Sequence, residues 1–284
     1  MLGKSRWGWG YYNSNANFTT AVPATTTYGS TFTPGASNAD GTAVDTGVTL
    51  AQDVQLIVIG IGGTAVSAAN TPTLMDLLVD PSGGTSWSTL IADLVCGYSR
   101  NTGASDPYTL YYTFPLFIKA GSKLGIQARS GHTVPAANAT CGIWVFGQPS
   151  RPGMWWCGQA VEGVGITPAS SSGTAVTPGS SNSWGSWTSI GSPTTAAFGA
   201  LQFATNAADN TQNTGSYHFE VGYGSTRLAL APFQQAGGTS ESRASFGPWL
   251  VNNVDVPAGT QMQVRGMASG ATIDAYDIAI YGTY

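Results

Sequence analysis

Charged side chains are scarce in this chain. Only 8% of its 284 residues are Asp, Glu, Lys or Arg, whereas 42% are hydrophobic. Amphipathic helices and coiled coils present a charged face to water, so this composition argues against a helical bundle. The net charge of −4 provides no basic field that would attract phosphates, which argues against a dedicated nucleic-acid-binding protein.

Long apolar runs and paired cysteines are also missing. The longest apolar stretch, 54–61, is far shorter than the ~18 residues of a membrane-spanning helix, so we expect no membrane insertion. No apolar segment follows Lys4 and Arg6 as it would in a secretory signal peptide, so we expect synthesis in the cytoplasm. The three cysteines form an odd set without metal-ligand spacing, which indicates reduced thiols.

Residues that carry nucleophilic catalysis are few. The chain has only two histidines, His132 in a Gly/Pro-rich segment and His218 beside the start of a strand. A serine or cysteine nucleophile needs a nearby base, and the sequence contains no nucleophile elbow, phosphate-binding loop or zinc-protease motif. We therefore expect no catalytic residue and no cofactor.

Paired carboxylates, which a glycosidase requires, are not placed to cooperate. Asp274 and Asp277 are three residues apart, which puts them on opposite faces of an extended strand. Asp76 and Glu220 are equivalent positions of the repeat described below, and we expect each to accept hydrogen bonds from backbone or from an arginine in its own half. The segment 40–45 (DGTAVD) lacks the dense alternating acids of a calcium loop, so we expect no metal site.

Turn residues are abundant. The chain has 38 glycines and 15 prolines, and Ser, Thr and Asn fill the spaces between its apolar runs. These residues favour turns that separate short strands. The composition therefore predicts an all-β protein.

The chain contains an internal repeat. Residues 33–38 (TPGASN) recur as 177–182 (TPGSSN), at a displacement of 144 residues. Loop deletions shorten the displacement to 135 where 143–147 matches 278–282. Two prolines within 148–152 favour an extended connection. We predict a duplication with domains at 1–149 and 150–284.

Each copy has the pattern of a β-sandwich. In 123–129 the apolar residues Leu124, Ile126 and Ala128 alternate with polar ones, and the second copy keeps this phase over 261–266. About eight short strands per copy, separated by turns, predict an antiparallel jelly roll or a close Greek-key relative. The expected strands of the first copy lie near 48–50, 54–61, 73–79, 88–95, 110–118, 123–129 and 140–147.

Four short segments occur in order in the first copy: 75–79 (MDLLV), 114–118 (FPLFI), 120–122 (AGS) and 143–147 (IWVFG). The second copy repeats their pattern. This arrangement resembles virion proteins of tailed bacteriophages and gene transfer agents. The resemblance implies jelly-roll modules used as head decorations, head spikes, collars or tail fibres, located in the virion and acting in assembly or host attachment. It implies other virion proteins and copies of the same chain as partners, and it brings no catalytic residues.

Two tryptophans lie in a Ser/Gly-rich segment of the second copy. Trp184 and Trp187 are separated by Gly and Ser, with Asn182 nearby. A sugar ring stacks on an exposed indole while neighbouring Asn and Ser side chains bond its hydroxyls. We predict that these tryptophans contact a glycan or host surface, or alternatively that they cap the core of the second domain. An alternative function is therefore a carbohydrate-binding module or adhesin.

An aromatic arm precedes the first copy. Trp7, Trp9, Tyr11 and Tyr12 are spaced by glycines in a segment too short to fold alone. Such an arm docks either on its own sandwich or on a neighbouring subunit. We predict that it takes part in assembly, with the first domain facing the particle and the second facing the host.

The closing strand of the first copy is apolar on both faces. Trp144 and Phe146 occupy the face that a solvated sandwich would expose. In the second copy we match this face to Asp277, Ala279 and Tyr281 and expect it to be wetter. Burying two such aromatics stabilises by several kcal/mol at ~25 cal/mol per Å², so we predict that a sister domain, the arm or another subunit covers Trp144 and Phe146.

Overall fold

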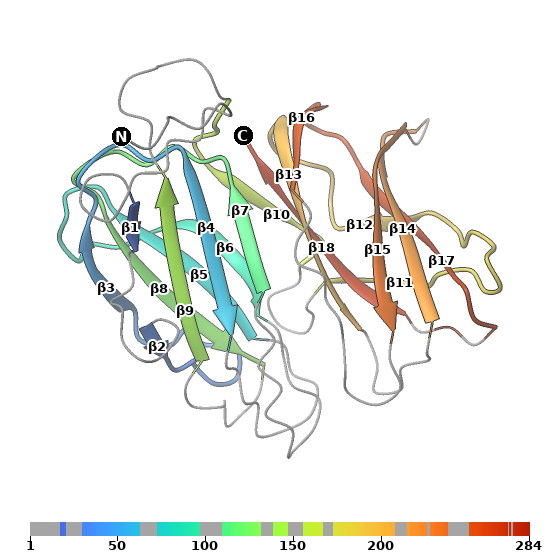
Figure 1. Ribbon diagram of the computed structural model, residues 1–284, viewed down its shortest axis with the longest axis horizontal. Coiled ribbons are helices and arrows are strands. Elements are labelled where there is room, and N and C mark those ends of the chain that lie inside the picture. The colour runs from blue at the N-terminus through green and yellow to red at the C-terminus, as the bar shows by residue number, and fades with distance from the viewer. Residues whose placement is uncertain are drawn as a thin grey trace, which may run out of the picture.

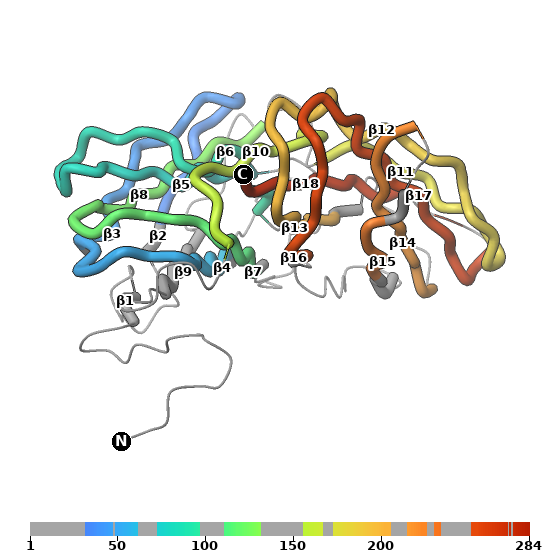
Figure 2. Tube along the Cα trace, turned by 90° about the horizontal axis from the view of Figure 1, so that it is seen from above, coloured from blue at the N-terminus to red at the C-terminus, as the bar shows by residue number. Residues whose placement is uncertain are grey.

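The structure is a computed structural model that describes residues 18–20, 30–62, 73–96, 110–131, 139–146, 156–166, 173–207, 215–225, 228–237, 250–271, 273 and 275–284. Its two halves lie side by side along the longest axis of the molecule (Figures 1 and 2). The described residues form strands and turns, and none of them belongs to a helix that could span a membrane. The all-β prediction is confirmed.

The first half is a sandwich of two antiparallel sheets. One sheet has the order β9-β4-β7, with β1 and β2 both paired to β9, and the other has the order β3-β8-β5-β6. The pairs β2–β9, β3–β8, β4–β7 and β5–β6 are those of one long hairpin rolled into two sheets, which defines a jelly roll. The strands are β1 (Phe18–Thr20), β2 (Ser30–Phe32), β3 (Val44–Thr49), β4 (Leu56–Gly62), β5 (Thr73–Asp80), β6 (Ser88–Cys96), β7 (Leu110–Phe114), β8 (Lys123–Ser130) and β9 (Ala139–Phe146).

The second half repeats this topology strand for strand. Its sheets have the orders β18-β13-β16, with β10 and β11 on β18, and β12-β17-β14-β15. The prediction of tandem jelly rolls from a duplication is therefore confirmed, while the domain boundary at 149/150 lies outside the described residues. The strands are β10 (Val161–Val164), β11 (Thr174–Val176), β12 (Thr188–Ile190), β13 (Phe198–Ala207), β14 (Gly215–Tyr223), β15 (Leu228–Gly237), β16 (Leu250–Val256), β17 (Met262–Ala268) and β18 (Tyr276–Thr283).

Most strand predictions agree with the structure to within two residues. β17 alternates strictly between buried and half-buried positions, as expected from its sequence. The run expected at 110–118 is shorter, because β7 ends at Phe114 just before Pro115, whose backbone cannot donate a ladder hydrogen bond. The strand expected at 48–50 begins earlier, at Val44.

The closing strands correspond at a different displacement from the one the sequence suggested. Ile143 lies opposite Ile59, and Ile280 lies opposite Phe203, the counterpart of Ile59 at displacement 144. β9 and β18 therefore match at 137 residues rather than 135. A shift of two residues keeps every side chain on the same face, which is why the sequence match looked consistent. The structural counterpart of Trp144 is Tyr281.

The two halves share part of a core. Ala204, Ala279 and Tyr281 of the second half belong to the buried cluster of the first half. The Tyr281 ring meets Tyr112 edge-on, with centroids 5.5 Å apart, and contacts Phe114 at 6.2 Å. Ala279 and Tyr281 have no exposed surface. The expectation that this face of the second copy is wetter is therefore wrong, because the first half covers it.

Hydrogen bonds fasten the halves together. The Val95 N–H of β6 donates to the Tyr281 hydroxyl at 2.9 Å, and that hydroxyl donates to the Asp93 carbonyl at 2.8 Å. The Thr113 N–H of β7 donates to the Gln202 side-chain oxygen at 2.8 Å. The outer face of β13 and β18 thus covers the edge strands β6 and β7 of the first sandwich.

Candidate functional site

A loop of the same shape lies beside one sheet in each half. Residues 33–43 and 177–187 connect β2 to β3 and β11 to β12. In the second half, the Gly179 and Gly185 N–H groups donate to the Gly266 carbonyl at 3.0 and 2.8 Å. The equivalent bonds of the first half join Gly35 and Gly41 to Ala128 at 2.9 and 2.8 Å. The repeated sequence motif therefore builds one corner twice.

The turn and the glycines of this loop explain the motif. Ser181 and Asn182 both have positive φ, and the Ser183 N–H donates to the Ser180 carbonyl at 3.0 Å, which defines a type I′ turn. A side chain at Gly179 would overlap the backbone of residues 183–185. Only glycine allows this close approach, so the motif fixes the position of the residues that follow it.

In the second half, this loop places two indoles around an arginine. The Arg265 guanidinium of β17 lies 4.6 Å from the ring centre of Trp184 and 4.8 Å from that of Trp187. Trp184 is 38% exposed, and Trp187 is half-buried. We call Trp184, Arg265, Trp187 and Glu220 the indole–arginine cluster. The prediction of a Trp184–Trp187 surface thus gains an arginine that sequence reasoning did not place there.

The charge of Arg265 is neutralised within the cluster. Its Nε and Nη2 atoms donate to the same Glu220 carboxylate oxygen at 2.8 and 2.6 Å. Glu220 on β14 lies directly opposite Arg265 on β17, so the sheet register brings the pair together. The cluster presents aromatic surface without net charge. Such surface suits a neutral polar ligand with apolar ring faces, because stacking on an indole needs no ionic partner.

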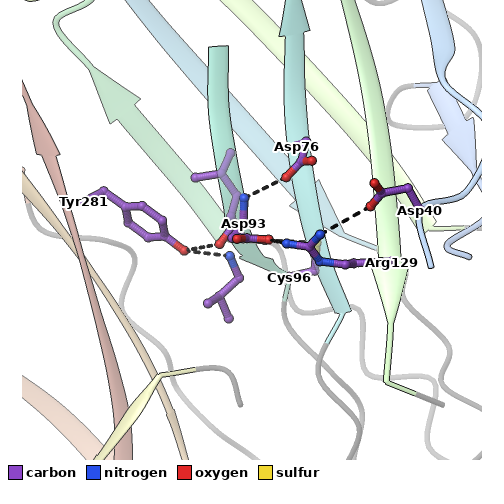
Figure 3. Close-up of polar contacts among 8 residues, drawn as sticks. Asp40, Asp76, Asp93, Cys96, Arg129 and Tyr281 are labelled. Carbon is purple, nitrogen blue, oxygen red and sulfur yellow. Dashed lines mark hydrogen bonds and ion pairs between the residues drawn. The ribbon is translucent and has the colours of Figure 1, made fainter. Parts of the chain in front are cut away.

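The equivalent loop region of the first half contains side-chain ion pairs instead of indole rings. Asp40, the counterpart of Trp184, lies 3.5 Å from the Arg129 guanidinium of β8. Arg129 also pairs with Asp93 of β6, whose positive φ of 57° marks a bulge in that edge strand. Figure 3 shows Asp93 between Arg129 and Tyr281, so the ion cluster adjoins the contact between the halves.

Asp76 on β5 completes the ion cluster. Its carboxylate accepts the Asp93 N–H at 2.8 Å (Figure 3). Burial raises its pKa to about 6, although the nearby Arg129 opposes this shift, while Asp40 adds to it. As expected, Asp76 accepts a hydrogen bond from a backbone N–H and Glu220 accepts one from an arginine, each within its own half.

Asp76→Asn is expected to remove a pH dependence of stability. Because the folded-state pKa of about 6 exceeds the ordinary 3.8, protonation of Asp76 favours the folded state. The stabilisation of the fold by the protonated Asp76 carboxyl is complete below the unfolded-state pKa. It is lost as pH rises through the folded-state pKa. Asparagine keeps an oxygen acceptor for Asp93, so the variant should gain about 1 kcal/mol near pH 7 after allowance for partial exposure.

Urea denaturation across this pH range checks the prediction, with Asp255→Asn at an exposed position as the control. An Asp76→Asn profile that still falls between pH 4 and 6 as steeply as the parent profile would show that other groups cause the dependence.

The remaining predicted residues are dispersed. Asp45 forms an ion pair with Lys123 at 2.5 Å, whereas Asp40 faces Arg129. The two acids of 40–45 therefore pair with different basic side chains. Among the described residues, no cluster of acids, histidines and cysteines is arranged to hold a metal. His218 and Asp277 are half-buried on β14 and β18. Trp7, Trp9, Tyr11, Tyr12, His132 and Asp274 lie outside the described residues, as do the side chains of Trp144 and Phe146 on β9.

Comparisons with known proteins give only distant similarities of fold. No family model and no curated protein matches the chain. Among solved structures, PNGF-II is 10% identical, with a TM-score of 0.39, and the match covers 94% of this chain but only 65% of PNGF-II. The PBSX exported protein XepA is 9% identical, with a TM-score of 0.24 and coverage of 94% and 86%. The CBM22-1–CBM22-2 tandem domain of Paenibacillus barcinonensis Xyn10C is 12% identical, with a TM-score of 0.26 and coverage of 99% and 94%.

Proposed function

We propose that this protein is a non-enzymatic structural component of a tailed bacteriophage or phage-like particle, and that its second half contacts the host surface. The observation that carries the proposal is that the equivalent loops of the two halves, 33–43 and 177–187, have different surroundings. The first copy holds an ion cluster around Arg129, whereas the second exposes Trp184 beside a neutralised Arg265. The resemblance of the strand motifs to virion proteins supports the particle assignment.

The chemistry of the indole–arginine cluster supports contact with a glycan. One side of each indole faces the Arg265 guanidinium, and Trp184 keeps 38% of its surface exposed. Exposed Asn182, Ser183 and Ser186 lie in the same loop and can bond hydroxyl groups. An indole that is already held in place loses little conformational entropy on binding. A saccharide of the host surface fits this arrangement.

The shared core supports a role as a rigid unit. Because Tyr281 and Gln202 bond the two sandwiches directly, a load on one half is transmitted to the other through these contacts. We propose that the first half and the aromatic arm face the particle, and that the second half is distal. The cytoplasm of the host is then the place of synthesis and the virion the place of action.

Co-sedimentation tests the particle assignment. The protein should migrate with purified particles in a density gradient and remain bound after washing. A protein that never enters the particle fraction would refute this assignment.

Replacing both tryptophans, Trp184→Ala with Trp187→Ala, is expected to reduce host adsorption about tenfold or more, because central aromatic contacts dominate binding energy. Incorporation into particles should be unchanged. Trp156→Ala is the matched control, since Trp156 is 46% exposed but packs against Gly199 of β13 in the other sheet. Loss of incorporation with normal adsorption would reverse the roles of the two halves.

A carbohydrate-binding module is the second candidate, and the exposure of Trp184 favours it. Glycan-array binding by the isolated protein, abolished by the double substitution and without any association with particles, would select this candidate. A secreted adhesin would in addition require a targeting segment.

A further inference from the structure

The contact between the halves consists of two surfaces. The docking face belongs to the second half and includes Gln202 on β13 and Tyr281 on β18, which lie opposite each other. The receiving edge belongs to the first half and includes Asp93 and Val95 on β6 and Phe114 on β7. Because the halves are duplicates, each surface has a counterpart in the other half.

The counterpart of the docking face lies on the first half. Val58 on β4 pairs with Trp144 on β9 as Gln202 pairs with Tyr281. Gln202 is fully buried by the first half, whereas Val58 is only half-buried. At these two positions the polar Gln202 is replaced by the apolar Val58, and Tyr281 is replaced by another large aromatic residue, Trp144. A sheet face of this composition favours association rather than contact with water.

The counterpart of the receiving edge lies on the second half, at β15 and β16. Val251 corresponds to Phe114, because they lie opposite the equivalent residues Leu201 and Ile57. Phe114 has no exposed surface, whereas Val251 is half-buried. At both of these positions, Gln202 and Phe114, the residue that is buried within the chain has a more exposed counterpart.

Pro232 gives this second edge a specific chemistry. It stands opposite Glu220, where β6 has its Asp93 bulge opposite Asp76. Proline has no N–H, so addition of an extended strand is disfavoured at this edge. Its carbonyl can still accept a hydrogen bond, as the Asp93 carbonyl accepts one from the Tyr281 hydroxyl at the first edge. An indole N–H, such as that of Trp144, is a donor of the same kind.

We propose that two copies of this chain associate head to tail, with the Val58–Trp144 face of one copy on the β15–β16 edge of the next. The contact repeats the geometry that joins the two halves within one chain. It is heterologous, so one copy can bind a neighbour at each end, which leads to a ring or a filament. This association goes beyond the proposed function, since it uses neither Trp184 nor Trp187.

Sedimentation equilibrium of the full chain over a wide concentration range tests the association. Val58→Arg and Trp144→Ser alter the face, whereas Val251→Arg and Pro232→Arg alter the edge. Each is expected to weaken association at least about tenfold, because a buried charge or a lost anchor disrupts the centre of the contact. Circular dichroism and the thermal midpoint establish folding, and having two variants per surface allows one to be discarded. Thr42→Arg, at an exposed position of the loop 33–43, is the control.

Mixing a face variant with an edge variant gives the decisive result. Each retains one intact surface, so the mixture should form a one-to-one dimer although neither variant associates alone. A parent protein that stays monomeric at all concentrations, as it would if its own arm covered the face, overturns the proposal. So does association that survives the substitutions, or a mixture that fails to pair, which would indicate a symmetric contact or another partner.

Discussion

Tyr281→Ala is expected to lower the free energy of unfolding by about 3–5 kcal/mol, as is usual when a fully buried aromatic side chain is truncated. The Tyr281 ring fills the side of the first sandwich between Tyr112 and Phe114, although it belongs to the second. Its removal opens a cavity in the core of the first half and breaks both hydroxyl bonds to β6. Urea denaturation followed by tryptophan fluorescence measures the loss.

Tyr281→Phe separates packing from hydrogen bonding. The phenyl ring keeps its place, but the Val95 N–H loses its acceptor in a buried site, which costs about 1–3 kcal/mol. Tyr284→Ala is the control, since Tyr284 is 40% exposed. If Tyr281→Ala were no more destabilising than Tyr284→Ala, the core would not be shared between the halves.

Gly179→Ala is expected to disturb both stability and attachment. A side chain at this position would overlap the backbone near Ser183 and Gly185, so the loop must move away from β17. The displacement should cost about 1–3 kcal/mol and carry Trp184 away from Arg265. We expect host adsorption to fall as far as it does in the double tryptophan variant.

The duplication supplies the matched control for this variant. Gly35 has the same surroundings in the first half, where a side chain would overlap the backbone near Ala39 and Gly41. Gly35→Ala should lose similar stability but keep normal adsorption. Equal adsorption defects in both variants would mean that the second half has no special part in attachment. Chemical denaturation and adsorption kinetics on the same preparations provide the two measurements.

The architecture was predictable because its signals are local and occur twice. Alternation in β8 and β17 fixed the buried face of each strand, and the repeated TPG motif aligned the two halves. The register of the closing strand was not predictable, since Ile143 matches Ile278 or Ile280 equally well in side-chain phase. Only pairing with β4 and β13 distinguishes these alternatives.

The candidate site was predictable only in part. The position of Trp184 and Trp187 in a polar loop indicated surface tryptophans, and the alternation over 261–266 indicated an outward face for the polar residues of that strand. That these three residues meet depends on how the loop crosses β17, which no local pattern encodes. The burial of Ala279 and Tyr281 was missed for a related reason, because contact between two domains leaves no periodic signal in either.

The position of Tyr281 also has a consequence for synthesis on the ribosome. Tyr281 lies 186 residues after Val95, whose N–H donates a hydrogen bond to the Tyr281 hydroxyl. At ordinary translation rates β6 emerges roughly 10–40 s before β18. Throughout that interval the nascent first sandwich exposes Tyr112 and Phe114 on its unfinished side. The first sandwich can therefore complete its core only after the last strand of the second sandwich has been synthesised. A chain terminated between β6 and β18 would be prone to aggregate.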